Sequence, residues 1–354
     1  MTHPSDVVRI APWKDDRQFA YSITYDEGLI ETAGFAWRLH RRYGIPGHVN
    51  AFPTMLGKLV GDTSAGFLQS LWNLQKYAEA EQLRFLIEEG WTIGCQFSAN
   101  ENENEQASPD TSWTAGILPA PLFQARQSLE KAIARPVHTL AFTDFHACET
   151  HRDLARQAGF RWLFTLHDDL NDPDEASHVI KRSPLYHCGP APIRLANDPY
   201  RLLARARDQN GWVVDVVRLV DRFPIDPARD CTPTELEARF AAVQKIGGDR
   251  VWAATPETVA GYRALRLSTQ IQNCVSTPDQ ISYHLAVSVP VDVSAPGELT
   301  FLVHLDDTWQ SPRAIVAGET VPLQPGPDSG SWLFTHPVVD GMEVKIEHGS
   351  RRSA

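Results

Sequence analysis

The segment Phe19-Ala-Tyr-Ser-Ile-Thr-Tyr-Asp-Glu-Gly28 has the pattern of a buried β-strand that ends in two carboxylates and a glycine. Aromatic and β-branched side chains predominate from Phe19 to Tyr25, and they are typical of covered strands. Asp26 and Glu27 follow where the strand should end, and Gly28 permits a sharp turn of the backbone. In α/β proteins the carboxyl ends of strands carry the functional residues. The two carboxylates are therefore candidate site residues, and an acidic, solvated turn is the alternative interpretation.

The composition is that of an ordinary globular protein, with 354 residues, 42% hydrophobic and 22% charged. The formal net charge of −11 disfavours a nucleic-acid partner, because phosphates would be repelled. No segment is apolar for long enough to cross a bilayer, and the first residues lack the features of a signal peptide. The five cysteines form no Cys-x-x-Cys pair, which predicts free thiols in a reducing compartment. We therefore expect a cytoplasmic protein that contacts neither membrane nor nucleic acid.

Strand and helix patterns alternate over about 250 residues, which predicts parallel βα units in a barrel or a doubly wound sheet. After residue 267 the pattern changes to short strands between Pro, Gly and Asp turns, which predicts an antiparallel β-sandwich. We expect an α/β domain over residues 1–266 and a sandwich over 267–354. No assignment is made for residues 166–199. The expected strands are 19–25, 48–52, 90–94, 137–142, 162–165, 212–217, 251–254, 281–289, 298–305, 313–316 and 343–347, and the expected helices are 29–43, 65–89, 122–134, 150–158, 201–207, 232–246 and 257–265.

Several segments resemble motifs of the polysaccharide deacetylase family (carbohydrate esterase family four). Thr24-Tyr-Asp-Glu-Gly28 resembles the Thr-Phe-Asp-Asp-Gly motif on the first strand of that family. Tyr43-Gly-Ile-Pro-Gly-His-Val-Asn50 resembles its second strand, Leu86-Ile-Glu-Glu-Gly-Trp-Thr-Ile-Gly94 the approach to its histidine motif, and Gly211-Trp-Val-Val214 a later strand. The resemblance covers residues from about 15 to 262. It implies a distorted (β/α) barrel of the polysaccharide-deacetylase type, followed here by a small all-β sandwich.

The resemblance also implies a reaction, the hydrolytic removal of acetyl groups from amino sugars. In the family, the first Asp of the opening motif is the general base. The second Asp and two histidines, spaced His-x-x-x-His, hold zinc or a similar divalent ion, and a later histidine is the general acid. Matched to this sequence, Asp26 falls on the base and Glu27 on the metal-binding Asp. Gln96 and Asn100 fall on the histidine pair, and Arg218 on the late histidine.

These replacements erode the usual zinc site. Gln96 and Asn100 offer neutral amide oxygens, which are weak ligands for zinc, and Glu27 is one methylene longer than Asp. Arg218 keeps its proton at working pH, so it could support an oxyanion but could not act as the acid. We expect no resident cofactor, or at most one divalent metal ion of the zinc type, with Glu27 and His48 as candidate ligands.

Other residues near the predicted strand ends are candidates for binding a ligand. Five polar residues lie near predicted strand ends or in the loops beyond them: His48, Asn50, Asp144, His146 and His151. Of these, His48 and His146 could face the same cleft as Asp26. Their other interpretation is as ordinary polar residues of strand ends and loops. Trp113 lies in a polar loop and could offer its ring to the apolar face of a sugar. The substrate-binding candidates are Gln96, Asn100, Asp144, His146 and Trp113.

Two functions remain open from the sequence. In the first, the protein is a hydrolase of acetyl esters or non-peptide C–N bonds, with Asp26 as catalytic base and Arg218 as oxyanion support. In the second, it is a catalytically inactive relative that binds an acetylated carbohydrate or a small amide, or serves as an interaction module. Zinc-dependent turnover would favour the first function. Saturable thermal stabilisation by sugars would indicate a binding site, whereas a purely structural protein, the third alternative, would show none.

Overall fold

The computed structural model describes residues 7–60, 75–97, 119–142, 149–185, 198–224, 229–288, 297–306, 309 and 311–348. The chain divides into two compact units. One comprises residues 20–172 and 177–258, and the other comprises residues 1–19, 173–176 and 259–354. The boundary expected at residue 266 lies inside helix α10 (Pro256–Ser268) and stays a prediction.

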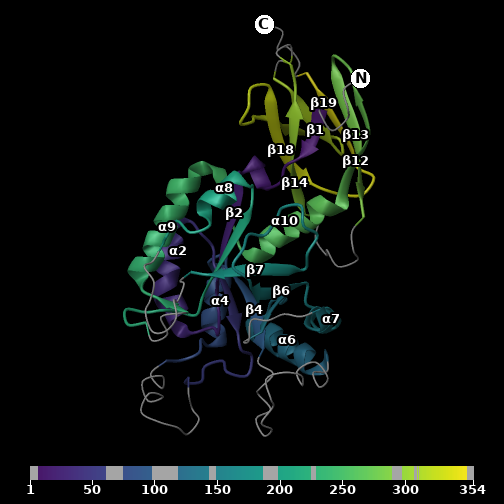
Figure 1. Ribbon diagram of the computed structural model, residues 1–354. Helices are drawn as coiled ribbons and strands as arrows, with labels where there is room; N and C mark the ends of the chain where they lie inside the picture. Colours follow the sequence, from purple (N-terminus) through teal and green to yellow (C-terminus); the bar gives the residue numbers. More distant parts are fainter. Residues whose placement is uncertain are drawn as a thin grey trace. The chain divides into compact units, whose positions relative to one another are not determined.

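Seven parallel strands of the first unit form a closed barrel (Figure 1). They follow the order β2-β3-β4-β5-β6-β7-β8, and β8 pairs again with β2. This confirms the expected α/β fold with a distorted (β/α) barrel, and it decides against the doubly wound sheet. The strands are β2 (Phe19–Tyr25), β3 (His48–Ala51), β4 (Thr92–Phe97), β5 (Thr139–Phe142), β6 (Trp162–Leu166), β7 (Val179–Pro184) and β8 (Trp212–Val217), and β11 (Val251–Ala253) lies beside β2.

Strand β2 pairs with β8 over a longer stretch than with β3, and this difference determines where the residues of the candidate site lie. All seven residues of β2 are buried. They pair with β8 over residues 20–25, but with β3 only at Thr24 and Tyr25, which lie opposite His48 and Val49. The carboxyl end of β2 therefore lies beside the first residues of β3. The short strands β9 (Leu219–Val220) and β10 (Asp230–Cys231) form a parallel pair directly after β8.

Helices follow most barrel strands and bury their apolar faces. They are α2 (Trp37–Tyr43), preceded by the π-helix η2 (Thr32–Ala36), α4 (Ala80–Glu88), α6 (Pro119–Ile133), α7 (Glu149–Gln157), α8 (Leu203–Asp208) and α9 (Pro233–Gly247). Helix α9 is tied to the barrel by a buried ion pair, in which Arg239 Nε lies 2.7 Å from Asp215 Oδ2 of β8. The Tyr21 hydroxyl donates to the same carboxylate oxygen at 2.6 Å.

The helix expected over residues 65–89 is wrong in part. Residues 61–74 lie outside the described residues, and the helix begins only at Ala80, where Glu79 and Gln82 form a capping box. The segment before it is extended, because Lys76 and Tyr77 form β-bridges to Leu59 and Leu29. The strand expected at 90–94 lies further along the chain, at Thr92–Phe97.

The second unit contains two antiparallel sheets that form the expected all-β sandwich. Their strand orders are β1-β14-β18-β17 and β12-β13-β19-β15-β16. The ring centroids of Tyr283 in β13 and Phe301 in β14 lie 6.0 Å apart, which places the two sheets face to face. The strands are β1 (Val8–Ile10), β12 (Thr269–Ser276), β13 (Gln280–Val287), β14 (Glu298–His304), β15 (Arg313–Val316), β16 (Glu319–Pro322), β17 (Gln324–Pro325), β18 (Ser331–Pro337) and β19 (Glu343–Glu347).

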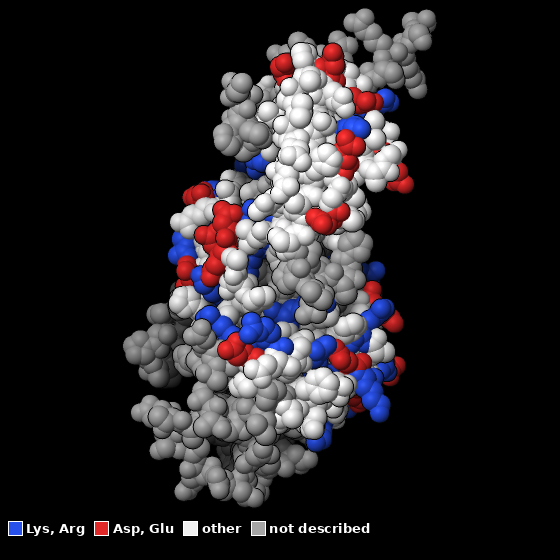
Figure 2. All heavy atoms as spheres, turned by 90° about the vertical axis from the view of Figure 1, so that its right-hand side faces the viewer, with Lys and Arg blue, Asp and Glu red and all other residues white. Residues whose placement is uncertain are grey.

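The surface carries charges of both signs. Figure 2 shows Lys and Arg side chains interspersed with Asp and Glu on one face of the molecule. Among the described helices, none has the length and apolar character needed to span a membrane. Within the described residues, Cys95, Cys231 and Cys274 take part in no disulfide.

Candidate functional site

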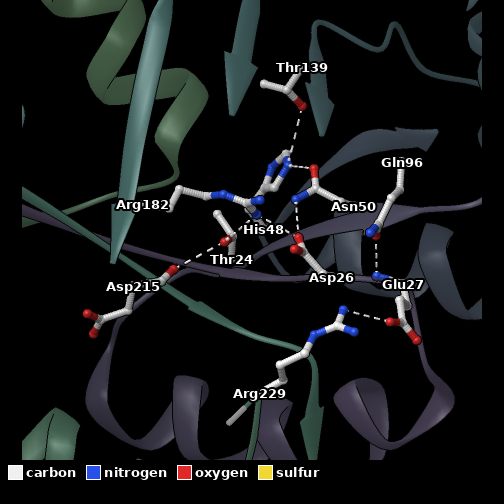
Figure 3. Close-up of polar contacts among 10 residues, drawn as sticks. All are labelled: Thr24, Asp26, Glu27, His48, Asn50, Gln96, Thr139, Arg182, Asp215 and Arg229. Carbon is white, nitrogen blue, oxygen red and sulfur yellow. Dashed lines mark hydrogen bonds and ion pairs between the residues drawn. The ribbon is translucent and has the colours of Figure 1, made fainter. Parts of the chain in front are cut away.

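The centre of the candidate site is the carboxylate of Asp26 at the end of β2, which is 1% exposed (Figure 3). Its backbone N–H donates to the carbonyl of Val217 at 2.9 Å, so that the pairing with β8 continues to this residue. Asp26 Oδ1 accepts hydrogen bonds from Asn50 Nδ2 at 2.8 Å and from Arg182 Nη1 at 2.6 Å. Asp26 Oδ2 is buried and has no partner among the described residues.

Arg182 of β7 supplies the positive charge beside Asp26. Its side chain is 0% exposed, and Nη1 also donates to Thr24 Oγ1 at 3.2 Å. The guanidinium carbon lies 4.9 Å from the ring centroid of Phe164, a cation–π distance. Arg182 Nε and Nη2 are buried without a partner in the described part of the chain. A buried charge is costly unless it is paired, so Arg182 and Asp26 stabilise each other.

A chain of hydrogen bonds leads from Asp26 through Asn50 to His48. Because the amide nitrogen of Asn50 donates to the carboxylate, its Oδ1 faces His48 Nε2 at 3.0 Å, and Nε2 must carry the proton. His48 Nδ1 then accepts from the hydroxyl of Thr92 at 2.8 Å. Burial lowers the pKa of His48 to about 4, and the charge of Arg182 adds to this effect. His48 is therefore a neutral imidazole with both ring nitrogens engaged.

Gly94 of β4 makes room for this chain. Gly94 pairs with Asn50, and a Cβ atom at its position would lie 2.6 Å from Asn50 Oδ1 and 2.7 Å from His48 Nε2. The same Cβ would lie closer still to Thr139 Oγ1, which is itself 3.3 Å from His48 Nε2. Only glycine fits here without displacing the polar side chains.

Glu27 faces a different partner. Figure 3 shows its side chain directed toward Arg229, and Oε1 lies 2.7 Å from Arg229 Nη2. Its backbone has a φ of 70°, the left-handed region that non-glycine residues seldom adopt. The Glu27 N–H donates to Gln96 Oε1. Burial raises the pKa of Glu27, and the charges of Arg229 and Arg218 oppose this rise.

Arg218 is held by a bidentate ion pair with Asp230. Its Nε and Nη2 donate to the two carboxylate oxygens at 2.8 and 2.7 Å, and the side chain is 3% exposed. Its Nη1 lies 3.7 Å from Glu27 Oε2. The expected support of an oxyanion by Arg218 stays a prediction, and in this geometry the guanidinium fixes strands β9 and β10 near the end of β2.

The structure brings together Asp26, Glu27, His48 and Gln96, and Arg218 joins them through Glu27. The remaining expected substrate-binding residues lie outside the described residues; they are Asn100, Trp113, Asp144 and His146. The sequence analysis missed Arg182, because no strand was assigned between residues 166 and 199. A signal was present, since Ile180 and Arg182 share the buried face of β7, and an arginine on such a face needs an anionic partner.

The donor set around Asp26 does not fit a zinc site. Zinc needs several free nitrogen, sulfur or carboxylate ligands at ~2.0–2.3 Å. Here Asp26 and Glu27 are paired with arginines, both nitrogens of His48 are engaged, and Gln96 Oε1 accepts a backbone bond. No cluster of three or more His, Cys, Asp or Glu suited to a metal occurs in the described ranges. A divalent ion beside Asp26 would also be repelled by Arg182.

No protein-family model matches this sequence, and no curated protein matches it. Among solved structures, the chain is similar to a protein described as a polysaccharide deacetylase from Mycobacterium smegmatis, with 14% identity, a TM-score of 0.41, and coverage of 72% of this chain and 93% of the other. It is also similar to the Xyl-CE4 domain of a multidomain xylanase from the hindgut metagenome of Trinervitermes trinervoides (7% identity, TM-score 0.38, coverage 68% and 89%). A third is a de-N-acetylase from Aggregatibacter actinomycetemcomitans (14% identity, TM-score 0.36, coverage 46% and 68%).

At these identities the likeness concerns the fold. The sequence motifs resemble those of polysaccharide deacetylases, and the strand pairing of this chain shows by itself that its parallel barrel is closed.

Proposed function

We propose that the protein binds an acetylated carbohydrate or a small amide at the carboxyl end of β2, without zinc-dependent hydrolysis. The observation that carries this proposal is the buried pair of Asp26 and Arg182, with 2.6 Å between Oδ1 and Nη1. In the family that the motifs resemble, the residue at the place of Asp26 is a base that works beside a metal ion. Here that residue is paired with a guanidinium, and the surrounding donor set does not fit zinc.

Unsatisfied polar atoms support a binding role. Asp26 Oδ2 is a free acceptor, and Gln96 Nε2 and Arg182 Nε and Nη2 are free donors among the described residues, all of them buried. Buried polar atoms in proteins nearly always have a partner, whether from protein, water or ligand. An acetamido group offers a carbonyl oxygen to such donors and an N–H to the acceptor. The motif resemblance adds the expectation that this group belongs to a sugar.

The alternative is a metal-independent hydrolase that uses Asp26 as its base. The free Oδ2 atom of Asp26 favours it, because a base needs an oxygen that can take a proton. However, the described neighbours that could give up a proton are engaged elsewhere. Glu27 is ion-paired with Arg229, Arg218 keeps its proton, and His48 is neutral with both nitrogens bonded.

The test combines binding and turnover on the same sample. The full chain, treated with a chelator, is titrated with N-acetylated chito-oligosaccharide and with acetamide. Thermal unfolding and acetate release are then measured. We expect a saturable rise in the unfolding temperature without release of acetate. Acetate release that requires added zinc would contradict the proposal, and so would the absence of stabilisation by either probe.

A matched pair of variants separates the site from general stability. Asp26→Asn keeps the shape of the side chain but removes its charge, and it should weaken binding. Asp215→Asn makes the same change at a buried carboxylate that pairs with Arg239. It should lower the unfolding temperature while leaving the affinity for the probe unchanged.

A further inference from the structure

We infer that Arg182 is the resident cation of this site: its guanidinium takes the place beside Asp26 that a metal ion would need, and it supplies donors to a neutral oxygen-bearing group. Only the second part rests on the proposed function, because the charge pair can be tested without any ligand.

The position of Arg182 is the first support for this inference. Its side chain is fully buried, and one nitrogen lies within hydrogen-bond distance of both Asp26 Oδ1 and Thr24 Oγ1. The ring of Phe164, which lies 4.9 Å from the guanidinium carbon, offers a second stabilising contact. Figure 3 shows the guanidinium directed toward the carboxylate of Asp26. The cation is therefore built into strand β7 and cannot exchange with solvent ions.

The charge balance of the site is the second support. Three ion-paired carboxylates, those of Asp26, Glu27 and Asp230, meet three guanidinium groups, those of Arg182, Arg218 and Arg229, and His48 is neutral. The formal charges cancel. A divalent cation would leave this buried cluster with two uncompensated positive charges, which is strongly unfavourable in a medium of low polarity.

The remaining hydrogen-bonding capacity indicates the chemistry of the ligand. Arg182 Nε and Nη2 and Gln96 Nε2 are buried donors without partners among the described residues, whereas Asp26 Oδ2 is a buried acceptor. A neutral group that carries acceptor oxygens and one O–H or N–H would satisfy both kinds of atom. A carboxylate or phosphate would be repelled by Asp26.

The test of the charge pair is a double-mutant cycle. Thermal unfolding is compared for the wild type, Arg182→Ala, Asp26→Asn and the double variant. Arg182→Ala should unfold at a lower temperature, because it leaves the Asp26 carboxylate buried and unpaired. The double variant should unfold at a higher temperature than Arg182→Ala, although it carries one more substitution. The reason is that an uncharged Asn side chain needs no partner of opposite charge. Equal unfolding temperatures for Arg182→Ala and the double variant would overturn the inference.

Chemical rescue provides a second measurement. Millimolar guanidinium chloride should raise the unfolding temperature of Arg182→Ala, because the free ion can occupy the place of the lost side chain. Sodium chloride at the same concentration should not, and neither salt should raise that of the wild type. If Arg182→Ala does not fold, Arg182→Lys replaces it. This variant keeps the positive charge but loses the planar guanidinium with its several N–H donors. Its unfolding temperature should again lie below that of the wild type. Rescue by sodium chloride to the same extent would contradict the inference.

Ligand binding gives the third measurement. In the presence of a chelator, the wild type should bind N-acetylated chito-oligosaccharide as tightly as with cobalt added, and Arg182→Lys should bind at least about tenfold more weakly. Arg239→Lys is the matched control, because Arg239 is an equally buried arginine paired with Asp215 outside the site. A requirement for metal in the wild type would overturn the inference. If the wild type binds no probe, the proposed function fails, while the double-mutant cycle still decides the role of Arg182.

Discussion

Each charged residue at the end of β2 needs a partner that compensates its charge, because several charges are buried in a small space. Asp26 satisfies this by sharing one carboxylate oxygen between Arg182 and Asn50. Breaking such a pair from one side costs roughly 3–5 kcal/mol in other proteins, whereas replacing both partners costs much less. The side chains around Asp26 are therefore coupled, and a substitution at one of them changes what the others require.

Gly94→Ala should destabilise the fold through this coupling. The added methyl group would enter the space of Asn50 Oδ1 and His48 Nε2, and overpacking of this kind costs about 1–3 kcal/mol. The free energy of unfolding, measured with urea, checks this. Gly34→Ala is the control, because its Cβ would meet nothing within 4 Å. Equal changes in the free energy of unfolding for the two substitutions would contradict this prediction, because the side chains of Asn50 and His48 could then move aside freely.

His48 should make the protein less stable in acid. Its pKa in the folded state is about 4, below the ordinary value near 6.5, so the unfolded chain takes up a proton first as the pH falls. The stability contributed by neutral His48 is complete above about pH 6.5, and about 3 kcal/mol of it is lost between about pH 6.5 and 4. We expect the urea midpoint of the wild type to fall more steeply over this window than that of His48→Gln. If the urea midpoints of the wild type and of His48→Gln fell in parallel over this window, the lowered pKa assigned to His48 would be refuted.

At the scale of elements, the sequence predicts the strands and helices whose pattern is local. Strands β2 and β8 are rich in aromatic and β-branched residues, and both lie where they are expected. Strand β7 was missed, because Lys181 and Arg182 interrupt its apolar pattern and Pro184 ends it. Asp26 and Arg182 are 156 residues apart in the sequence. No local spacing encodes their contact, which only the closure of the barrel creates.

The error over residues 65–89 has a similar origin. The spacing of the apolar residues in this region favours one long helix, but Tyr77 instead packs in a cluster with Leu29, Phe52 and Leu219. Tertiary packing overrides helical spacing there. Asp26, Glu27 and Arg218 could be selected from the sequence as candidate site residues, whereas Arg182 and Arg229, which pair with the two carboxylates, were not selected.

Helix α9 offers a test at the scale of one element. Thr232 caps this helix, since its hydroxyl accepts from the Glu235 N–H while the Glu235 side chain accepts from the Thr232 N–H. Thr232→Ala should cost about 1 kcal/mol of unfolding free energy. Thr234→Ala, an exposed threonine in the same turn, should change stability little. A larger effect at Thr234 than at Thr232 would contradict the assigned cap.

At the scale of the whole molecule, the order of segments in the chain differs from their order in space. Strand β1 near the start of the sequence pairs with β14, with Val8 opposite Val303, and it completes a sheet whose other strands come from the last third of the chain. The sandwich therefore depends on residues that the expected domain boundaries assigned to the barrel domain.

Deletion of residues 1–10 should expose β14 as an edge strand. Its amides would lose one neighbouring strand, and we expect faster hydrogen exchange over Glu298–His304. The amides of β8, which belong to the other unit, serve as the internal control. Unchanged exchange in β14 would mean that β1 contributes nothing to the stability of this sheet.

The central claim is that a guanidinium, rather than a metal ion, neutralises Asp26. The most direct measurement is the metal content of the purified full chain after dialysis against a buffer that contains zinc. The account predicts far less than one zinc ion per chain, with no difference between the wild type and a variant that carries Asp26→Ala and Glu27→Ala. About one ion per chain in the wild type, lost in that variant, would show that the site holds a metal and would contradict the account.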